Sequence, residues 1–321
     1  MKNNLGKILI AAPVHSVLIE GLNAKGYECV VREKITQAEA FSLIKDCVGV
    51  VTSTRLLLDK ELLDSAPLLR WIARMGSGME IIDTQYAAQK DIACFSSPEG
   101  NRNAVGEHAV GMLLSLVHRI AWSYGEIKEG LWLREQNRGM ELEGKTIGII
   151  GYGNTGRAFE KKLRGFDMRV LAYDKYMQEG FPEHVTNCKD LTPIFEEADI
   201  VSFHVPLQAD TVYYLNREFI GNMRKPFILI NTSRGGVVDM KDLFQGLRAG
   251  KVRGACLDVL EQEPLAAMDA DMRALLNEMQ LLPQVIITPH IAGYTVESLY
   301  KMSNILLHKI FKKDDKINST I

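Results

Sequence analysis

Short apolar runs alternate with stretches of helical periodicity along most of this chain. This alternation is typical of β–α units with a mainly parallel sheet, because each helix carries the chain back over the sheet. Amphipathic stretches over 16–25 and 38–46 separate the early runs. The first hundred residues therefore predict one α/β unit, with expected strands at 7–12, 28–31, 48–52 and 70–73.

A second series of apolar runs predicts another, larger α/β unit, with expected strands at 146–150, 169–173, 200–204, 227–231, 254–258 and 285–288. Two long stretches of helical spacing lie outside both series, at 104–119 and 295–312. Since no β–α unit follows the second stretch, we expect it to return the chain to the first unit. The predicted fold class is α/β, with two Rossmann-like, doubly wound parallel-sheet domains joined by hinge helices.

Composition narrows the classes of function. The 321 residues are 46% hydrophobic and 24% charged, and 38 Lys and Arg balance 40 Asp and Glu. A formal charge of −2 provides no field that attracts nucleic acid or an anionic membrane. The apolar runs are far shorter than the ~20 residues that span a bilayer, and the start of the chain lacks a signal-peptide pattern. We expect neither a nucleic-acid nor a membrane partner.

The cysteines give no sign of a disulfide framework or a zinc site, because they are scattered and never form a Cys-x-x-Cys pair. They are Cys29, Cys47, Cys94, Cys188 and Cys256. No other cluster of ligand side chains suggests a metal. We therefore expect a cytoplasmic protein without a metal.

A glycine-rich motif follows the expected strand 146–150 and precedes a helical stretch. In the pattern Gly-x-Gly-x-x-Gly, the first glycine permits a tight turn, the second lets the backbone approach a pyrophosphate, and the third allows close helix–strand packing. The following helix start presents N–H groups to the anion. The motif thus predicts a dinucleotide site formed by Gly151, Gly153, Asn154, Thr155 and Gly156.

Asp174 ends the next expected strand, 18 residues after Gly156. That spacing suits the acid that binds the ribose 2′-hydroxyl, and its charge disfavours a 2′-phosphate, so NAD is preferred over NADP. The adjacent Lys175 weakens this preference, and Asp174 alternatively only ends a strand. Arg157 either contacts the pyrophosphate or is simply exposed.

Three later segments each end an apolar run with an ionisable residue, namely Arg234, Glu263 and His290. Ligands bind at the carboxyl ends of strands in open α/β sheets. An arginine can hold a carboxylate, and a histidine can exchange a proton near neutral pH. A glutamate beside that histidine stabilises its protonated form. Spacing alone leaves open whether Glu261 or Glu263 faces the histidine.

Taken together, the motifs resemble the D-isomer-specific 2-hydroxyacid dehydrogenases, and most closely their phosphoglycerate dehydrogenase-like branch. The resemblance covers nearly the whole chain, and the order of the motifs is more specific than any one of them. They are GYGNTG (151–156), HVPL (204–207), NTSRGG (231–236), LDVLEQEP (257–264) and TPHIAG (288–293).

The resemblance implies an NAD-dependent oxidoreductase that transfers a hydride between nicotinamide and a 2-hydroxy or 2-keto acid. It implies that Arg234 anchors the substrate, His290 is the acid/base, and Glu263 is the partner of His290. Glu263-Pro264 matches the family, which favours Glu263 over Glu261. The implied substrate contacts are Arg74, Gly76, Ser77, Gly78 and Asn101. Further implied cofactor contacts are His204, Pro206, Thr232 and Asp258, the last near the nicotinamide amide.

The family also implies a domain order. Residues 1–103 and 294–321 would form the substrate-binding domain, and residues 104–293 the NAD-binding Rossmann domain. The segment 121–142, with Trp122, Trp132 and Leu133, resembles the one through which family members pair, so a homodimer is expected. The chain ends soon after the return helix, so the regulatory extension of the longer phosphoglycerate dehydrogenases is expected to be absent.

Some assignments stay open. Where the family usually has Asp-Asn after the glycine loop, this chain has Glu80-Ile81. Arg74 is either the contact for a substrate 3-phosphate or an exposed arginine without a ligand, and Glu107-His108 is assigned to packing and hinge chemistry. The expected activity is phosphoglycerate dehydrogenase-like, with hydroxypyruvate/glyoxylate reductase as the alternative. An NAD(H)-sensing binding protein is the rival from another class.

Overall fold

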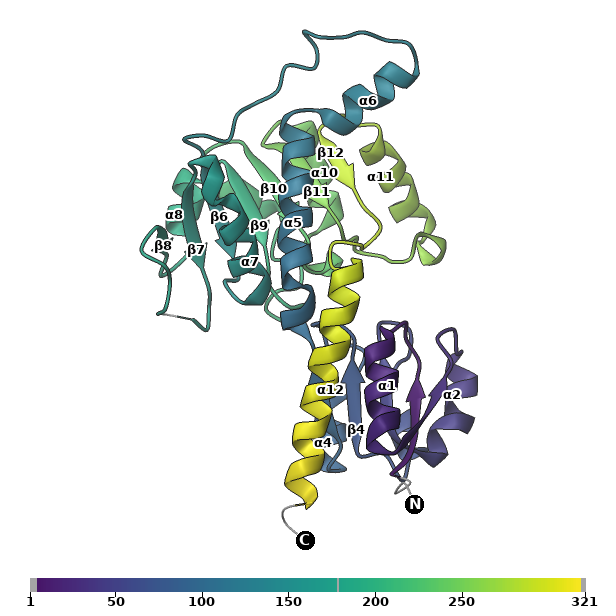
Figure 1. Ribbon diagram of the computed structural model, residues 1–321. Helices are drawn as coiled ribbons and strands as arrows, with labels where there is room; N and C mark the ends of the chain where they lie inside the picture. Colours follow the sequence, from purple (N-terminus) through teal and green to yellow (C-terminus); the bar gives the residue numbers. More distant parts are fainter. Residues whose placement is uncertain (1–4, 178, 319–321) are drawn as a thin grey trace. The chain divides into compact units, whose positions relative to one another are not determined.

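The computed structural model describes residues 5–177 and 179–318, with side chains up to residue 313. The chain divides into two compact units: Met1–Arg102 with Tyr294–Ile321, and Asn103–Gly293. Each is an α/β unit built on a parallel sheet (Figure 1). The first division lies within helix α5 (Pro98–Val117) and the second just before helix α12 (Val296–Asn318).

The first unit has a five-stranded parallel sheet in the order β2-β1-β3-β4-β5. Its strands are β1 (Gly6–Ile10), β2 (Tyr27–Val31), β3 (Cys47–Thr52), β4 (Trp71–Arg74) and β5 (Ala93–Ser96). Besides α12, its helices are α1 (Ser16–Lys25), α2 (Gln37–Leu43), α3 (Lys60–Asp64) and α4 (Thr84–Gln89), with a 3-10 turn at Ile44–Asp46.

Both faces of this sheet are buried. Leu9, Val50 and Ile72 belong to one apolar cluster, whereas their strand neighbours Ile8 and Val51 belong to another that includes residues of α12. Successive side chains of a strand point to opposite faces, and helices cover both faces of a parallel sheet. For this reason most of these strands consist of nearly continuous apolar runs in the sequence.

The second unit has a seven-stranded parallel sheet in the order β12-β11-β10-β9-β6-β7-β8. Its strands are β6 (Thr146–Ile150), β7 (Arg169–Tyr173), β8 (Val185–Asn187), β9 (Ile200–Phe203), β10 (Phe227–Asn231), β11 (Val252–Leu257) and β12 (Val285–Ile287). Its helices after α5 are α6 (Ile120–Lys128), α7 (Asn154–Leu163), α8 (Thr192–Glu197), α9 (Arg217–Asn222), α10 (Met240–Arg248) and α11 (Ala270–Gln280), with 3-10 turns at Arg164–Phe166, Gly235–Val237 and Leu265–Ala267.

This strand order places the switch of a doubly wound sheet between β6 and β9. Ligands of such sheets bind beyond the carboxyl ends of the strands at this switch. The predicted class of two parallel-sheet α/β units is confirmed. The fold thus brings the glycine motif after β6 and the His204 segment after β9 to one edge.

The largest differences from the prediction are two strands that it missed and one helix that begins earlier. Strand β5 is half-buried along its whole length, and β8 has three residues, of which only Val185 is buried. Neither therefore gives a strong apolar run. Helix α5 begins at Pro98 rather than near residue 104, because proline is well tolerated in the first turn of a helix.

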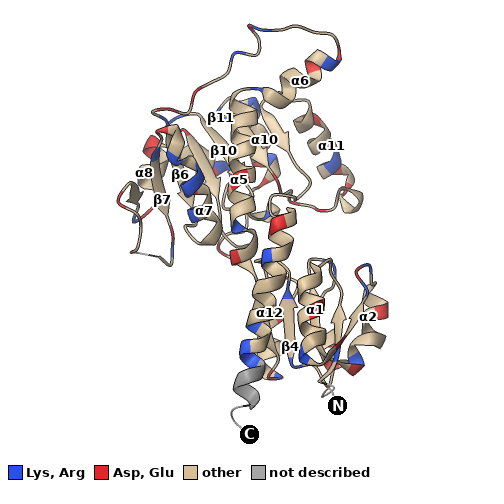
Figure 2. Ribbon diagram, in the orientation of Figure 1, with Lys and Arg blue, Asp and Glu red and all other residues tan. Residues whose placement is uncertain are grey.

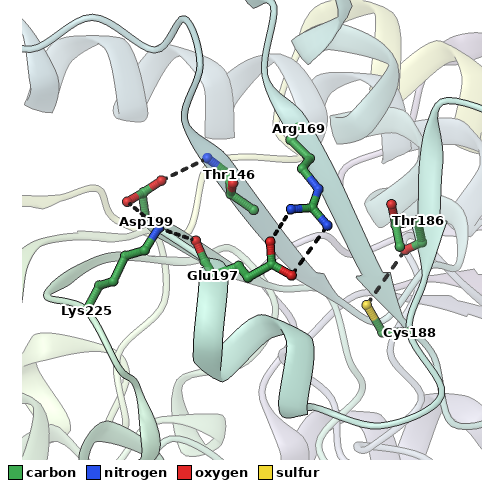
Figure 3. Close-up of polar contacts among 7 residues, drawn as sticks. All are labelled: Thr146, Arg169, Thr186, Cys188, Glu197, Asp199 and Lys225. Atoms are coloured by element: carbon green, nitrogen blue, oxygen red, sulfur yellow. Dashed lines mark hydrogen bonds and ion pairs between the residues drawn. The ribbon is translucent and has the colours of Figure 1, made fainter.

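The opposite, amino-terminal edge of the second sheet is held by polar contacts (Figure 3). The Asp199 carboxylate accepts the Thr146 N–H at 2.9 Å, and Lys225 Nζ donates to the Glu197 carbonyl at 2.8 Å. Glu197 also pairs with Arg169. These bonds connect the starts of three strands with α8 and the segment before β10, at the end of the sheet away from the glycine motif.

Acidic and basic residues are interspersed along both units (Figure 2). Within the described ranges, no helix is both long enough and apolar enough to cross a membrane.

Candidate active site

The glycine motif forms the turn between β6 and α7. Gly151 has φ of +91°, and a Cβ there would lie 2.5 Å from the His204 carbonyl oxygen. A Cβ on Gly156 would lie 2.2 Å from the Gly151 carbonyl oxygen. Gly153 faces open space, with no atom within 4 Å of its would-be Cβ. The backbone therefore requires glycine at the first and third positions and leaves room beside the second, as a bound pyrophosphate needs.

Helix α7 starts at this loop. Gly153 is its N-cap residue and supplies no side-chain hydrogen bond to the first turn, which contains Asn154 and Thr155. The first N–H groups of a helix have no partner within the helix and attract anions. The helix start thus fits the pyrophosphate of a dinucleotide.

Asp174, after β7, is fixed by the same loop. Its Oδ2 accepts the Tyr152 N–H at 2.7 Å, and its Oδ1 accepts the N–H groups of Tyr176 and Met177 at 2.9 and 3.0 Å. Lys175, which complicated the choice between NAD and NADP, pairs with Asp210 at 2.6 Å. The carboxylate therefore has a defined position next to the glycine turn, and the neighbouring cation is engaged elsewhere.

Arg157, in the first half of α7, is exposed and contacts the loop through Tyr152. Its Nε donates to the Tyr152 carbonyl at 3.2 Å, and its guanidinium lies 5.8 Å from the Tyr152 ring centroid. We therefore assign Arg157 to the support of the glycine turn.

Across the switch, His204 is half-buried, and desolvation of its ring lowers its pKa to about 3. Its Nε2 lies 2.9 Å from Ser202 Oγ, whereas Nδ1 has no hydrogen-bond partner in the described part of the chain. The Thr232 hydroxyl, after β10, is likewise buried without one. The Pro206 carbonyl accepts the Thr211 hydroxyl at 2.6 Å. His204 is thus neutral at physiological pH, which suits a wall of the cofactor site rather than an acid.

The pair His290 and Glu263 is formed at the same edge. His290 Nδ1 lies 2.7 Å from Glu263 Oε2, and Glu263 Oε1 accepts the Leu260 N–H at 2.7 Å. The His290 side chain is 41% exposed and that of Glu263 32% exposed. A histidine oriented by a carboxylate through one ring nitrogen, with its ring accessible, has the arrangement of a general acid/base.

The structure also distinguishes the two neighbouring glutamates. Glu261 accepts the Tyr213 hydroxyl at 2.7 Å and the Met240 N–H at 3.3 Å, so it is directed away from His290. Tyr213 is a site-supporting residue that sequence reasoning missed. It is 48 positions from Glu261, and no local motif marks it.

Arg234 follows β10 and is half-buried, with Nη1 donating to the Ser233 carbonyl at 2.7 Å. The Asn231 side chain fixes this turn by donating to the Arg234 carbonyl at 2.9 Å. Next to it, a Cβ on Gly235 would lie 1.7 Å from the Leu260 carbonyl oxygen. The loop that carries Arg234 is therefore packed on the segment that carries Glu263.

Asp258, the acid expected near the nicotinamide amide, is held by several hydrogen bonds at the end of β11. It is 1% exposed, and its oxygens accept the Thr288 hydroxyl at 2.6 Å and the N–H groups of Ile291 and Ala292 at 2.9 and 2.8 Å. Burial would raise its pKa, but the nearby His108 imidazole, 3.5 Å away, and hydrogen bonds from Thr288 and these amides hold it below the usual value. Asp258 thus anchors the turn that carries His290.

In the other unit, the loop Gly76–Gly78 follows β4. The Gly76 N–H donates to Ser97 Oγ at 3.0 Å, and the Gly76 carbonyl accepts the Ser97 N–H at 2.8 Å. Within the described residues, the N–H groups of Ser77 and Gly78 have no such partner. The loop therefore offers two amides rather than three, and Ser97, which sequence reasoning missed, fixes it.

Arg74 is buried rather than exposed, at 7%. Its Nη1 donates to the Met75 carbonyl at 3.1 Å and occupies the space where a Gly76 Cβ would lie, 1.8 Å away. Asn101, on α5, has a buried Oδ1 without a hydrogen-bond partner among the described residues. Arg74 thus supports the loop from within.

The family of this chain follows from a sequence comparison. The family described as "D-isomer specific 2-hydroxyacid dehydrogenase, NAD binding domain" matches residues 110–292. The chain belongs to the D-isomer-specific 2-hydroxyacid dehydrogenase family. As in this family, it is an NAD-dependent oxidoreductase acting on 2-hydroxy acids.

Relatives of this dehydrogenase include a hydroxypyruvate reductase of Thermotoga maritima, 36% identical over 88% of this chain and 90% of the relative. A D-3-phosphoglycerate dehydrogenase of Methanocaldococcus jannaschii is 32% identical over 96% of this chain, but the chain spans only 57% of that relative. Among solved structures, a D-lactate dehydrogenase of Aquifex aeolicus in complex with NAD and lactic acid has a TM-score of 0.82 and 29% identity, with 96% of each chain covered.

Proposed function

We propose that this dehydrogenase reduces small, unphosphorylated 2-keto acids of the hydroxypyruvate and glyoxylate type with NADH. The burial of Arg74 carries the choice of substrate. A phosphate-binding arginine must present its guanidinium to the ligand, but that of Arg74 is enclosed and bonded to the Met75 carbonyl at 3.1 Å. The hydroxypyruvate reductase of T. maritima, of similar length, supports the same substrate class.

The proposed roles of the residues follow from their contacts. Arg234 binds the substrate carboxylate and carbonyl, and His290 gives a proton to the carbonyl oxygen. Glu263 orients the imidazole, since its Oε2 lies 2.7 Å from His290 Nδ1. NADH, when bound, supplies the hydride to substrate C2.

The substrate and cofactor contacts implied by the family are proposals on the same footing. The Ser77 and Gly78 N–H groups bind the substrate carboxylate. Asn101, whose Oδ1 is buried, is a further contact of the substrate. We further propose that residues 1–103 with 294–321 form the substrate-binding domain. The proposed NAD contacts in residues 104–293 are Gly151, Gly153, Asn154, Thr155, Gly156, Asp174, His204, Pro206 and Thr232.

We propose a homodimer formed through the segment 121–142 and the adjoining Ile120. Figure 1 shows α6 and the chain after it projecting from the sheet of their unit. This segment exposes large apolar side chains, and exposed apolar patches mark interaction sites. They are Ile120, Tyr124, Ile127, Leu131 and Trp132, exposed by 43–78%. Trp122 and Leu133 are half-buried, and Met140 packs on the core of the unit.

We also propose that the enzyme works in a reducing cytoplasm. All five cysteines lie within the described residues and are unpaired, and Cys47, Cys188 and Cys256 are buried.

The deciding experiment is NADH oxidation with glyoxylate, hydroxypyruvate and 3-phosphohydroxypyruvate. We expect turnover with the first two and a kcat/KM for the phosphorylated compound no higher than for hydroxypyruvate. A preference of tenfold or more for the phosphorylated compound would refute the substrate class, and the exposed Arg55 after β3 would be the next residue to substitute. No turnover with any 2-keto acid would favour the NAD(H)-sensing alternative.

A further inference from the structure

His108, on helix α5, lies beside the turn that carries His290. Its Nε2 is 3.0 Å from Thr288 Oγ1 and 3.5 Å from Asp258 Oδ1. Thr288 itself is 180 positions away in the chain. The His108 side chain is 22% exposed and Asp258 1%, so water competes little for these bonds.

The direction of the hydrogen bonds follows from counting protons. The Thr288 hydroxyl has one hydrogen, and its shortest contact is the Asp258 carboxylate at 2.6 Å. A hydroxyl donates preferentially to a charged acceptor. The Thr288 oxygen therefore accepts from His108, which must carry a hydrogen on Nε2. His108 therefore donates to Thr288, and Thr288 donates to Asp258.

Asp258, the last acceptor in this series of hydrogen bonds, holds the turn that carries His290. Asp258 accepts the N–H groups of Ile291 and Ala292 at 2.9 and 2.8 Å, and its carbonyl accepts the His290 N–H at 2.8 Å. His290 itself has a left-handed backbone, with φ of 55°. Such a conformation persists in a residue with a Cβ only where the surroundings fix it.

We propose that His108 is a positioning residue for His290, acting as the first donor of the relay His108–Thr288–Asp258. Hydrogen bonds in a chain polarise and strengthen one another in a buried site. The imidazole of His108 thus holds the Thr288 hydroxyl on Asp258, which in turn holds the turn of residues 288–292. The role in reduction rests on the proposed function, whereas the role in holding the turn does not.

The competing explanation is that His108 only fills space beside the turn. Two substitutions of His108 distinguish this packing role from the proposed hydrogen-bonding role. His108→Leu keeps an apolar body without a donor, whereas His108→Gln puts an amide N–H near the position of Nε2. His118→Leu, at an exposed histidine just after the same helix, is the matched control. If His108→Leu does not fold, His108→Asn replaces it, because the shorter amide does not reach Thr288.

The first measurement is hydrogen–deuterium exchange of peptides covering residues 285–293, which needs no substrate. We expect exchange at the Ile291 and Ala292 amides to quicken about tenfold in His108→Leu and to return toward the wild-type rate in His108→Gln. The double variant of His108→Leu with Thr288→Val should exchange no faster than Thr288→Val alone, since coupled residues are not additive. Unchanged exchange in His108→Leu, or additive effects, would overturn the relay.

The second measurement is steady-state reduction of glyoxylate with NADH. Because small misplacements of reacting groups are costly, we expect kcat to fall about tenfold in His108→Leu, with little change in the dissociation constant of NADH, and to recover in His108→Gln. Equal activity of the Leu and wild-type proteins, or equal loss in the Leu and Gln variants, would refute the role in reduction. If the wild-type protein reduces no 2-keto acid, the proposed function fails while the exchange data still decide the relay.

Discussion

Glu263 and His290 lie 2.7 Å apart, and the carboxylate is fixed on its other oxygen by the Leu260 N–H. The imidazole of His290 is thus oriented by an acceptor that is itself held in place by the backbone.

Replacing His290 with Ala removes the proposed proton donor. We expect kcat for glyoxylate reduction to fall on the order of 10²–10⁴-fold, the range typical of a lost general acid. NADH affinity, measured by fluorescence titration, should change little, since the glycine turn and Asp174 lie in other segments. Full activity of His290→Ala would show that another group is the acid.

Glu263→Gln keeps the size of the side chain but replaces the carboxylate beside His290 Nδ1 with a neutral amide. We expect kcat for glyoxylate reduction to fall by about tenfold, because a hydrogen bond to a charged acceptor holds the imidazole more firmly than one to a neutral acceptor. Steady-state rates with glyoxylate and NADH test this. Glu196→Gln, at an exposed glutamate of α8, is the control, and an unchanged kcat in Glu263→Gln would contradict the assignment.

Asp174→Asn should weaken the discrimination against NADP. The negative charge at this position opposes a 2′-phosphate, and Lys175 is paired with Asp210 at 2.6 Å. We expect the ratio of kcat/KM for NADPH to that for NADH to rise about tenfold. An unchanged ratio would mean that Asp174 does not face the ribose.

Glu160 predicts a pH-dependent stability. Burial would raise its pKa, but hydrogen bonds from His184, Arg164 and Tyr152 hold it below the ordinary value of 4.5. A carboxylate with a lowered pKa in the folded state stabilises the fold above the unfolded value, and this contribution is lost as pH falls through the folded value. Glu160→Gln should lower the free energy of unfolding by roughly 1–3 kcal/mol at pH 7.

Urea denaturation at several pH values measures this effect. The difference between Glu160→Gln and the wild-type protein should shrink as pH falls below about 4.5. Glu196→Gln should match the wild-type protein throughout. A difference that stays constant with pH would show that the charge of Glu160 is not responsible.

A charged residue in the exposed apolar segment after α5 should separate the subunits. The Trp132 side chain is 78% exposed, and Trp132→Glu introduces a charge that a buried interface would have to dehydrate. Light scattering at micromolar concentration should show a dimer for the wild-type protein and a monomer for this variant. Leu281→Asp, at an equally exposed leucine elsewhere (75%), should remain dimeric. A monomeric wild-type protein would contradict the proposal.

Those features of the fold that depend on a local pattern of apolar residues could be predicted from the sequence. Strands buried on both faces gave long apolar runs, so β6, β7 and β10 were found at their observed bounds. The half-buried β5 and the short β8 gave no such run. Candidate site residues could be proposed at strand ends because parallel strands bring their carboxyl ends to one edge.

The supporting contacts could not be predicted in this way. His108 meets Thr288 across 180 positions, and Ser97 meets Gly76 across 21. Such partners are determined by the packing of helices and loops on the finished sheet, and no spacing in the sequence encodes them.

The left-handed backbone of His290 links activity to a loss of stability. At φ of 55°, a residue with a Cβ is disfavoured by roughly 1–2 kcal/mol, whereas glycine adopts this conformation freely. His290→Gly would therefore relieve the turn and abolish the proposed proton transfer. Under selection for heat resistance alone, position 290 is expected to drift from histidine toward glycine or asparagine, whereas selection for turnover opposes that drift. An enzyme selected for heat resistance without a screen for activity would therefore be expected to lose its proposed proton donor.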